Sequence, residues 1–338
     1  MRRSVRTGAA GLAGVLALSA CAGTGAEGDG ERAGLKAATA ASLPTSQRFD
    51  LTKPSYDLFR GKSLQDGTVM QSFAFDQVNK RLFTAQVSSG SGSDARGDLT
   101  ITQLDFKGNK LGYMRLKGYG HGVSIGVEPS GTASYLWTET NAVQFTDANG
   151  NTSSRGKNLA RFKFVNGTTL TNSSSALTKY TPVSGQGSVT ASIDPINNRL
   201  AMRYQKSGQW RIAVWKLSDL KARNYSAKLA DIAQPATVSG ISFQGYALYG
   251  SYVYLYHGSA YSASNPKPGN TYLSAVDLNT GKLVGKPFLT GAGSTLSYRE
   301  AEGLAIYKAG SQVRLFLGFA SGSSGARKAN LFYKNALV

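Results

Sequence analysis

The sequence contains a single cysteine, Cys21, among 338 residues. Without a second cysteine no disulfide can form within the chain, so its stability must come from a packed core. Histidine is almost as scarce, because His121 and His257 are the only two. A three-ligand zinc site would need both histidines and a carboxylate to converge, so we expect neither a metal nor a cofactor.

Long apolar runs are also missing. Residues 8–20 form an apolar run of 13 residues, which is too short to span a bilayer and typical of the middle of an export signal. The run follows three arginines and ends in Leu18-Ser19-Ala20-Cys21. This pattern predicts a lipoprotein signal peptide at residues 1–20, with cleavage before Cys21 and lipidation of its thiol. The alternative is an ordinary secretory signal whose cysteine is incidental.

Residues 21–46 are rich in Ala, Gly, Thr and Ser and have no periodic apolar pattern, which predicts a flexible, lipid-anchored linker. We therefore expect the protein outside the cytoplasm, attached to the cell membrane through lipid on Cys21 alone and facing the cell wall. The pair Arg2-Arg3 leaves open whether export uses the general or the twin-arginine route.

Acidic residues are few, 19 against 38 basic ones, which gives a net charge of +19. Residues 21–338 alone carry 35 basic and 19 acidic residues, a net charge of +16. Such a surface attracts polyanions, namely nucleic acid, anionic lipid or a phosphate-rich wall polymer. The expected location excludes nucleic acid as a partner. The alternative is that the charge serves only solubility or general adhesion.

No long amphipathic helical pattern is present either. From residue 47 onward, short alternating apolar runs are separated by Gly, Asn, Asp and Pro turns, and the 40 glycines and 17 tyrosines fit an all-β chain. One pattern recurs five times, a polar residue followed by a small-and-apolar strand. Its copies are Gln71-Ser72-Phe73-Ala74-Phe75, His121-Gly122-Val123-Ser124-Ile125, Gln186-Gly187-Ser188-Val189, Gln244-Gly245-Tyr246-Ala247-Leu248 and Glu302-Gly303-Leu304-Ala305-Ile306.

A second strand is expected after each copy, at Arg81–Gln86, Tyr135–Thr138, Arg199–Gln205, Tyr252–His257 and Val313–Phe319. Five copies of a four-stranded unit predict a five-bladed β-propeller over residues 47–338, in preference to a β-sandwich or β-solenoid. The last copy ends after its third strand. The N-terminal segment Arg48–Thr52 can supply the missing strand and close the ring, so the anchor would enter through the fifth blade.

The polar residue that opens each copy belongs to one ring at the top of the propeller. These five residues, Gln71, His121, Gln186, Gln244 and Glu302, are candidate ligand contacts. The connections between second and third strands lie on the same face, and all but Lys206–Gln209 are long. The alternative is structural: the ring residues bond each other or water, and the glycines allow tight packing at the axis. Further ligand-binding candidates near this mouth are Arg203, His257, Arg299 and Glu300.

Three segments carry a resemblance to a known family: Met70–Gln86 (MQSFAFDQVNKRLFTAQ), Gly120–Trp137 (GHGVSIGVEPSGTASYLW) and Tyr298–Tyr307 (YREAEGLAIY). They resemble the teichoic acid biosynthesis protein C family, whose relatives include receptor-binding propellers of staphylococcal phages. The resemblance covers roughly residues 47–338. It implies a five-bladed propeller that meets wall teichoic acid.

The residues favour binding over catalysis. The ring offers one carboxylate, Glu302, whereas a glycosidase needs two, and neither a His-Glu-x-x-His motif nor a phosphate-binding Gly-x-x-x-x-Gly-Lys motif is present. We therefore expect a monomeric surface lipoprotein that binds wall teichoic acid or a similar polyanionic glycopolymer. One alternative is a hydrolase, phosphodiesterase or glycosidase, with His121 and Glu302 as candidate catalytic groups. A second alternative is a scaffold for protein–protein interaction.

Overall fold

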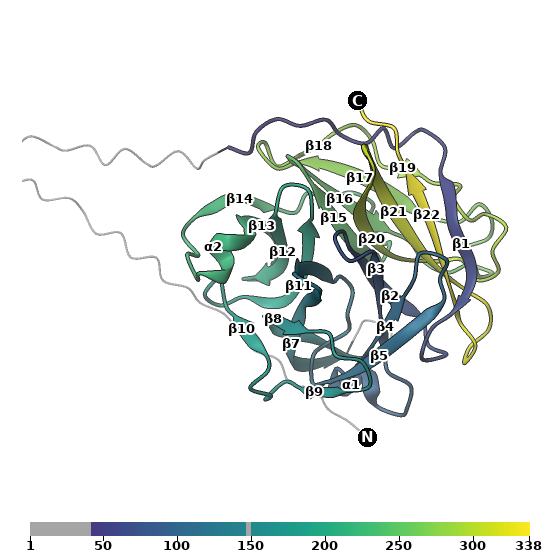
Figure 1. Cartoon of the computed structure of the whole chain (residues 1–338). Helices are drawn as coiled ribbons and strands as arrows, with labels where there is room; N and C mark the ends of the chain where they lie inside the picture. The colour runs from purple at the N-terminus through teal and green to yellow at the C-terminus, as the bar shows by residue number, and fades with distance from the viewer. Residues whose placement is uncertain (1–41, 147–149) are drawn as a thin grey trace, which may run out of the picture. The chain divides into compact units, whose positions relative to one another are not determined.

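The computed structural model describes residues 42–146 and 150–338, which fall within one compact unit. Its strands form five antiparallel sheets arranged around a ring, which is the five-bladed β-propeller predicted from the repeat (Figure 1). The two helices of the described ranges are short, α1 (Ser93–Arg96) and α2 (Leu217–Lys221). No helix in these ranges is long and apolar enough to cross a membrane.

Each blade has an inner strand nearest the axis and outer strands toward the rim. Blade 1 consists of β2 (Met70–Asp76), β3 (Arg81–Val87), β4 (Leu99–Leu104) and β5 (Lys110–Lys117). Blade 2 consists of β6 (Gly126–Ser130), β7 (Ala133–Thr146), β8 (Thr152–Lys163) and β10 (Thr178–Tyr180). Blade 3 consists of β11 (Gly187–Asp194), β12 (Arg199–Lys206), β13 (Gln209–Lys216) and β14 (Lys228–Ala233).

Blade 4 consists of β15 (Phe243–Tyr249), β16 (Tyr252–His257), β17 (Tyr272–Asp277), β18 (Lys282–Leu283) and β19 (Phe288–Leu289). Blade 5 consists of β20 (Glu300–Ala309), β21 (Gln312–Ser321), β22 (Lys328–Lys334) and β1 (Tyr56–Ser63). The short β9 (Thr169–Thr171) pairs in parallel with the outer edge of blade 1 at β5. The five inner strands contact one another in a closed cycle, β2–β6–β11–β15–β20 and back to β2.

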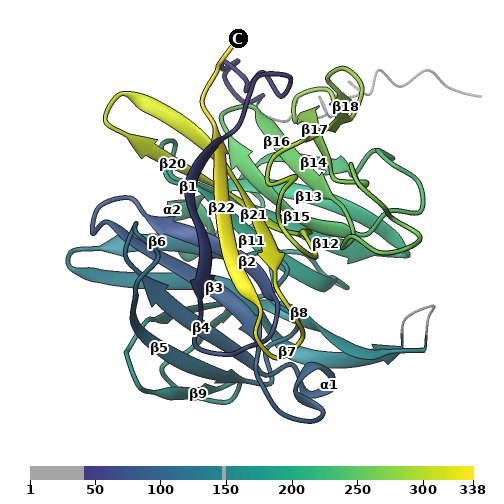
Figure 2. The ribbon, with the colours of Figure 1, turned by 90° about the vertical axis from the view of Figure 1, so that its right-hand side faces the viewer.

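An N-terminal strand closes the ring, as predicted, but it lies further along the chain than Arg48–Thr52. The outer strand of blade 5 is β1, which runs antiparallel to β22 (Figure 2). Phe49 makes only an isolated bridge to Leu337. Pro54, which cannot donate a backbone hydrogen bond, separates this bridge from β1.

Leu43, which lies within the predicted linker, packs against the propeller. It is buried between blades 3 and 4, and its backbone N–H and C=O both bond to the Asn279 side chain, at 2.8 and 2.9 Å. At this position the chain therefore contacts blades 3 and 4 rather than the fifth blade. Cys21 and the signal peptide lie outside the described residues.

The apolar core lies between the blades. Five clusters of buried residues each join two neighbouring blades, so the last cluster, around Phe75, Tyr307 and Phe316, joins blade 5 to blade 1. An alternating strand presents one set of side chains to each neighbouring blade, which explains why the strands are buried on both faces. Closure of the ring thus completes the core as well as the hydrogen-bonded edges.

Small residues let the inner strands approach at the axis. A Cβ added to Gly245 would lie 2.9 Å from the Cα of Gly303, and a Cβ added to Gly303 would lie 2.8 Å from the Cα of Ser72. The Ser72 hydroxyl in turn donates to the Gly122 carbonyl at 2.6 Å. The glycines of the repeat therefore have a packing role, which was the structural alternative for that pattern.

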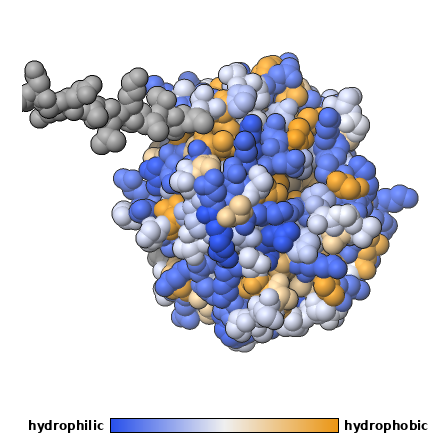
Figure 3. Space-filling view, turned by 60° about the vertical axis from the view of Figure 1, so that its left-hand side comes forward, coloured by the Kyte–Doolittle hydropathy of each residue, from blue (hydrophilic) through white to orange (hydrophobic). Residues whose placement is uncertain are grey.

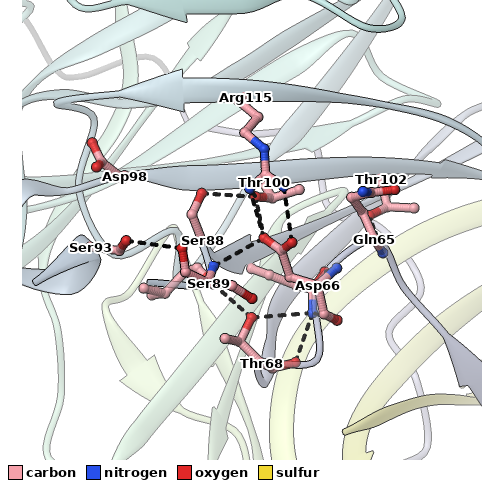
Figure 4. A network of polar contacts seen from close by, with 12 residues as sticks. Gln65, Asp66, Thr68, Ser88, Ser89, Ser93, Asp98, Thr100, Thr102 and Arg115 are labelled. Carbon is pink, nitrogen blue, oxygen red and sulfur yellow. Dashed lines mark hydrogen bonds and ion pairs between the residues drawn. The ribbon is translucent and has the colours of Figure 1, made fainter. Parts of the chain in front are cut away.

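The link between β1 and β2 is fastened to blade 1 by a buried polar network around Asp66 (Figure 4). The Asp66 carboxylate accepts two hydrogen bonds from Arg115, at 3.0 and 3.1 Å, and one from the Thr100 hydroxyl at 2.6 Å. Burial opposes ionisation of Asp66, but Arg115 and Thr100 outweigh it and hold the pKa of the carboxyl below its usual value. A charged, bidentate pair of this kind fixes the link that carries the closing strand.

Candidate ligand-binding site

The top face of the propeller is the one where β2, β11, β15 and β20 begin. It carries the connection from β3 to β4, which contains α1, and the long connections from β16 to β17 and from β21 to β22. Within the connection predicted at Glu139–Lys157, residues 139–146 and 152–157 instead continue β7 and β8, which project from the blade as a pair (Figure 2). Blade 3 has the tight turn predicted between Lys206 and Gln209.

Three of the predicted ring residues lie at bulges in inner strands. Strand pairing shifts register between Met70 and Ser72, between Phe243 and Gly245, and between Ala301 and Leu304. The skipped residues include Gln71, Gln244 and Glu302. A bulge redirects the side chain of the extra residue, so the repeat places its polar residue where the ladder is interrupted.

The other two ring residues precede their strands. Gln186 lies just before β11 and is buried; its amide donates to the Lys157 carbonyl at 3.1 Å and accepts from Val183 N–H at 2.9 Å. His121 lies five residues before β6, between Gly120 and Gly122, which both have positive φ. Gln186 therefore supports a loop, whereas the His121 side chain remains partly exposed.

His121 is tied to the connection that contains α1. Its Nδ1 lies 2.7 Å from Asp94 Oδ1 and 3.0 Å from Ser153 Oγ, and Ser153 Oγ donates to the same Asp94 oxygen at 2.9 Å. Burial raises the pKa of Asp94, but the hydrogen bonds from His121 and Ser153 outweigh it and bring the pKa below its usual value. Serine and aspartate meet the same ring nitrogen, so this cluster lacks the two-sided relay of a Ser-His-Asp triad.

Sequence reasoning missed Glu139, which shapes the backbone around His121. Its buried carboxylate accepts from the N–H groups of His121 and Gly122, at 3.0 and 2.7 Å, and from Gly156 N–H. A Cβ at Gly120 would lie 2.3 Å from the Glu139 carboxyl carbon, so glycine is required there. Burial raises the pKa of Glu139 despite these donors. The available signal was an acidic residue directly after the predicted strand Tyr135–Thr138.

The sequence Gly122-Val123-Ser124-Ile125-Gly126 also matches the Gly-x-Ser-x-Gly pattern of a nucleophile elbow, and this match was missed. Ser124 is buried, and its Oγ donates to the Ala191 carbonyl of blade 3 at 2.8 Å. The segment leads into a strand instead of a helix. Ser124 therefore joins two blades and does not present a nucleophile.

Glu300 and Glu302 lie together at the start of β20, after a strained turn. Tyr298 and Arg299 are consecutive residues with φ of 68° and 40°, a left-handed conformation that side chains other than glycine rarely adopt. The Tyr298 hydroxyl donates to Glu300 at 2.6 Å, and Glu302 is 2% exposed with an Oε2 that has no partner in the described chain. Burial, with the Glu300 charge, raises the pKa of Glu302 well above its usual value.

Arg299, predicted to contact a ligand, is fully buried beneath this turn. Its guanidinium donates to the carbonyls of Ala292 and Thr290, at 2.9 and 2.7 Å, and to the Thr271 hydroxyl at 3.0 Å. Each of its three guanidinium nitrogens thus donates a hydrogen bond within the chain. Between His121 and Glu302, the described residues show no hydrogen bond or ion pair, and no group of three or more His, Cys, Asp or Glu side chains could hold a metal.

Arg203 and His257 are brought together at the boundary of blades 3 and 4. The guanidinium carbon of Arg203 lies 3.5 Å from the centre of the Trp210 ring and 3.7 Å from that of Phe243. The Phe243 ring packs edge-on against the His257 ring, with centres 5.5 Å apart. Burial and the Arg203 charge lower the pKa of His257 to about 4, so its imidazole is neutral at neutral pH.

Two cavities open on this side of the top face, and Trp210 lines both. The cavity toward blade 2, about 480 Å³, is lined by Val143, Gln144, Phe145, Arg155, Lys157, Gly187, Ser188, Gln205 and Trp210. The cavity toward blade 4, about 580 Å³, is lined by Gln209, Trp210, Ala233, Gln234, Pro235, Ala236, Thr237, Val238, Ser239 and His257. Neither lining contains an acidic residue. Sequence reasoning missed Trp210 and Arg155, although a tryptophan beside the single tight top turn was visible.

The surface is largely hydrophilic on the face shown in Figure 3. In the face shown in Figure 3, apolar residues form small scattered groups among polar ones. Phe145 is 38% exposed and Trp210 is partly buried. These two rings therefore form small apolar areas beside cationic side chains and do not belong to a large apolar patch.

Comparisons with known proteins agree with this architecture. A family model described as the phage five-bladed β-propeller receptor-binding platform domain matches residues 69–333. A Bacillus subtilis (strain 168) protein named as a major teichoic acid biosynthesis protein C is 30% identical over 296 residues, 84% of this chain and 63% of that protein. The chain thus spans less than two thirds of the length of this curated relative.

Among solved structures, the tail fibre of Staphylococcus aureus phage P68 matches 83% of this chain and 52% of its own length, with 22% identity and a TM-score of 0.65. At this identity the likeness establishes the fold. A thermostable family-43 glycoside hydrolase matches 80% of this chain and 91% of its own length, with 11% identity and a TM-score of 0.39. That likeness is too distant to support a statement about activity.

Proposed function

Because the chain belongs to the family of phage five-bladed β-propeller receptor-binding platform domains, we propose that it binds an anionic, phosphate-rich polymer of the cell wall on the top face of its propeller. The observation that carries the proposal is the cavity between blades 2 and 3. It combines the cations of Arg155 and Lys157 with the aromatic rings of Phe145 and Trp210 and has no acidic residue in its lining.

Each part of this lining suits a polyol-phosphate chain. The Arg155 guanidinium lies over the Phe145 ring, 5.3 Å from its centre, and can pair with phosphate through two N–H groups. Lys157 is exposed and supplies a second positive charge. Partly exposed aromatic rings offer flat apolar surfaces for the carbon skeleton of a sugar or polyol. The excess of basic over acidic residues in the whole chain attracts polyanions to the protein.

We further propose wall teichoic acid as the polymer. The support is the name of the Bacillus subtilis relative, which refers to teichoic acid, together with the phage receptor-binding family. Lipid attached to Cys21, at the start of the proposed linker 21–46, would hold the propeller at the outer surface of the cell membrane, beneath the wall. The hydrolase alternative has less support, since the two candidate catalytic groups, His121 and Glu302, share no hydrogen bond or ion pair in the described residues.

Binding of purified wall teichoic acid to the full chain carrying Cys21→Ser tests this proposal, because the substitution removes any contribution of lipid. Lys157→Gln removes one charge from the cavity, and we expect it to weaken binding and to reduce the slope of log affinity against log salt by about one. The matched control is Lys107→Gln, which removes the same charge from the exposed turn between β4 and β5 on the opposite face.

Isothermal titration at several salt concentrations, with assay of released phosphate in the same mixtures, gives both readouts. Salt-sensitive binding without released product, weakened by Lys157→Gln more than by Lys107→Gln, supports the proposal. Equal effects of the two substitutions would place binding elsewhere or reduce it to general charge attraction. Absence of binding even at low salt would overturn the proposal and favour the protein-scaffold alternative.

A further inference from the structure

We propose that Arg203 is the anchor of a second phosphate-binding subsite beside the cavity between blades 3 and 4. Two residues that line this cavity, Trp210 and Gln234, contact Arg203, and Trp210 also lines the cavity between blades 2 and 3. The inference rests on the proposed function and specifies it. It assigns the tightest contact with the polymer to a buried arginine. The surface cations Arg155 and Lys157 then provide the weaker, salt-sensitive contribution to binding.

The first observation is an uncompensated buried cation. Arg203 is 6% exposed, and no ion pair joins it to a carboxylate in residues 42–146 and 150–338. A buried charge without a counter-charge costs folding free energy unless hydrogen bonds or a ligand compensate it. Arg299 is also buried without an ion pair in the described ranges but donates three hydrogen bonds, whereas the Arg203 guanidinium donates one. Burial lowers the pKa of the Arg203 guanidinium to about 9, which still leaves it positive at neutral pH.

The second observation is how the guanidinium is held. Trp210 and Phe243 cover its two flat faces, with ring centres 3.5 and 3.7 Å from the guanidinium carbon. Its single hydrogen bond within the described chain runs from Nε to Gln234 Oε1, at 2.6 Å. The two terminal nitrogens are therefore left for a ligand, and the ring sandwich fixes the plane in which an anion must approach. Two parallel N–H groups in one plane match two oxygens of a phosphate.

The third observation is the adjoining cavity. Three residues near Arg203 line this cavity: Trp210 stacks on its guanidinium, Gln234 bonds to it, and His257 lies close by. Thr237 adds a hydroxyl group to the lining. His257 is 5% exposed and its Nδ1 has no partner in the described ranges, while Nε2 lies 3.3 Å from the Thr237 hydroxyl. A neutral imidazole can donate one hydrogen bond to phosphate without repelling Arg203.

Trp210 forms a wall of both cavities, so a linear polymer bound in one can continue over the ring into the other. Arg155 lies close enough for its charge to contribute to the lowered pKa of Arg203. The arrangement suits a polyol-phosphate chain that places one phosphate at Arg203, its carbon skeleton on Trp210 and the next phosphate near Arg155. A short polymer with two phosphates should then bind much more tightly than a single phosphate.

Arg203→Lys tests the inference, because lysine keeps the charge but loses the planar pair of donors. With the full chain carrying Cys21→Ser, we expect wall teichoic acid affinity to fall at least tenfold, whereas Lys157→Gln lowers it only a few-fold. Inorganic phosphate and phosphatidylglycerol vesicles are measured in parallel. An affinity for the polymer that exceeds the affinity for the vesicles would distinguish wall phosphate from lipid headgroups. Unchanged polymer affinity in Arg203→Lys would overturn the subsite while leaving the proposed function standing.

A second measurement leaves Arg203 unchanged, so it does not depend on whether an Arg203 variant folds. The chain has two histidines, so the His257 imidazole signal in a proton NMR spectrum is identified by comparison with His121→Gln. We expect wall teichoic acid to shift the His257 signal in the otherwise native chain, with saturation at the stoichiometry found by titration. Polymer binding that leaves this signal unchanged would place the polymer outside the cavity and contradict the subsite. Failure of the otherwise native chain to bind polymer at all would instead contradict the proposed function.

Discussion

The guanidinium of Arg203 lies flat against the Trp210 ring, with its carbon 3.5 Å from the ring centre. Arg203 belongs to β12 and Trp210 to β13, which are joined by the tight turn on the top face. Ring and cation stabilise each other, and the Trp210 ring also lines both top-face cavities. Trp210 is therefore both a packing partner for a buried charge and an exposed surface for a ligand.

This dual position makes Trp210 a spectroscopic probe. The other two tryptophans, Trp137 and Trp215, are fully buried, so a ligand on the top face should change the emission of Trp210 alone. We expect wall teichoic acid to alter tryptophan fluorescence in the native chain and to leave that of Trp210→Phe unchanged. Since phenylalanine keeps a ring over Arg203, Trp210→Phe should retain affinity within about threefold, whereas Trp210→Ala should lose most of it. A fluorescence response that persists in Trp210→Phe would exclude contact at this ring.

Glu302 should make stability depend on pH in a defined direction. Burial raises its folded-state pKa well above the unfolded value near 4.5, so the folded state holds an extra proton above that pH. The contribution of this group is then greatest below pH 4.5 and is lost as the pH rises toward the folded pKa. The Glu302→Gln side chain stays neutral at every pH. As the pH rises, the free energy of unfolding of this variant should therefore increase relative to that of the native chain, by up to ~1.4 kcal/mol per pH unit.

Urea unfolding of both chains at pH 5, 6, 7 and 8 measures this difference. His257 has the opposite dependence, because its lowered pKa makes stability fall as the pH drops from about 6.5 toward 4. That effect is present in both chains and cancels in the comparison. A difference in unfolding free energy that stays constant over the series would mean that Glu302 is not held neutral by its surroundings.

Gly303 should tolerate alanine poorly because it lies between two inner strands. It has φ of 75°, and an added Cβ would lie 2.8 Å from Ser72 Cα. The matched control is Gly310, which has φ of 60° but no atom within 4 Å of an added Cβ. We expect Gly310→Ala to cost about 1 kcal/mol from backbone strain alone, and Gly303→Ala to cost about 3 kcal/mol because the clash is added. Equal losses in chemical denaturation would show that the axis can expand.

Asp194 should couple blade 3 to blade 4. Its carboxylate accepts from the N–H groups of Ile196 and Asn197 in its own turn, and its Oδ2 also accepts from Gly250 N–H of blade 4 at 2.9 Å. Asp105 makes the corresponding bonds only within its own turn, which makes Asp105→Ala the matched control. We expect Asp194→Ala to lower the free energy of unfolding by about 3 kcal/mol and Asp105→Ala by about 1 kcal/mol. Comparable melting temperatures for the two variants would argue that the contact between blades contributes little.

Much of the fold could be predicted because the information is local. The second strands expected at Arg199–Gln205 and Tyr252–His257 agree with β12 and β16, since alternation of apolar residues fixes which face of a strand is buried. The closing strand was placed too early because Phe49 and Leu51 have the same apolar signal as β1. Their burial is explained by the core between blades 4 and 5, which the sequence does not display.

The candidate site was less predictable. The position in the repeat identified Gln71, Gln244 and Glu302 as one set. Arg299 was expected at the surface, but it is buried and donates three hydrogen bonds within the chain. Arg203 was named from its place near the top of a strand. The sequence does not single out Trp210, because a tryptophan in an alternating strand is typical of a buried core position.

The sequence by itself determined that the chain is all-β, that it repeats five times and that a strand outside the repeats must close the ring. These follow from alternation and turn residues within a few positions of each other. Only the tertiary structure decided that Arg203 contacts Trp210, Phe243 and Gln234, beside a cavity that Trp210 and Gln234 line. They come from two adjacent blades and the link between them, and their side chains meet because neighbouring blades pack face to face, a contact that no local pattern encodes.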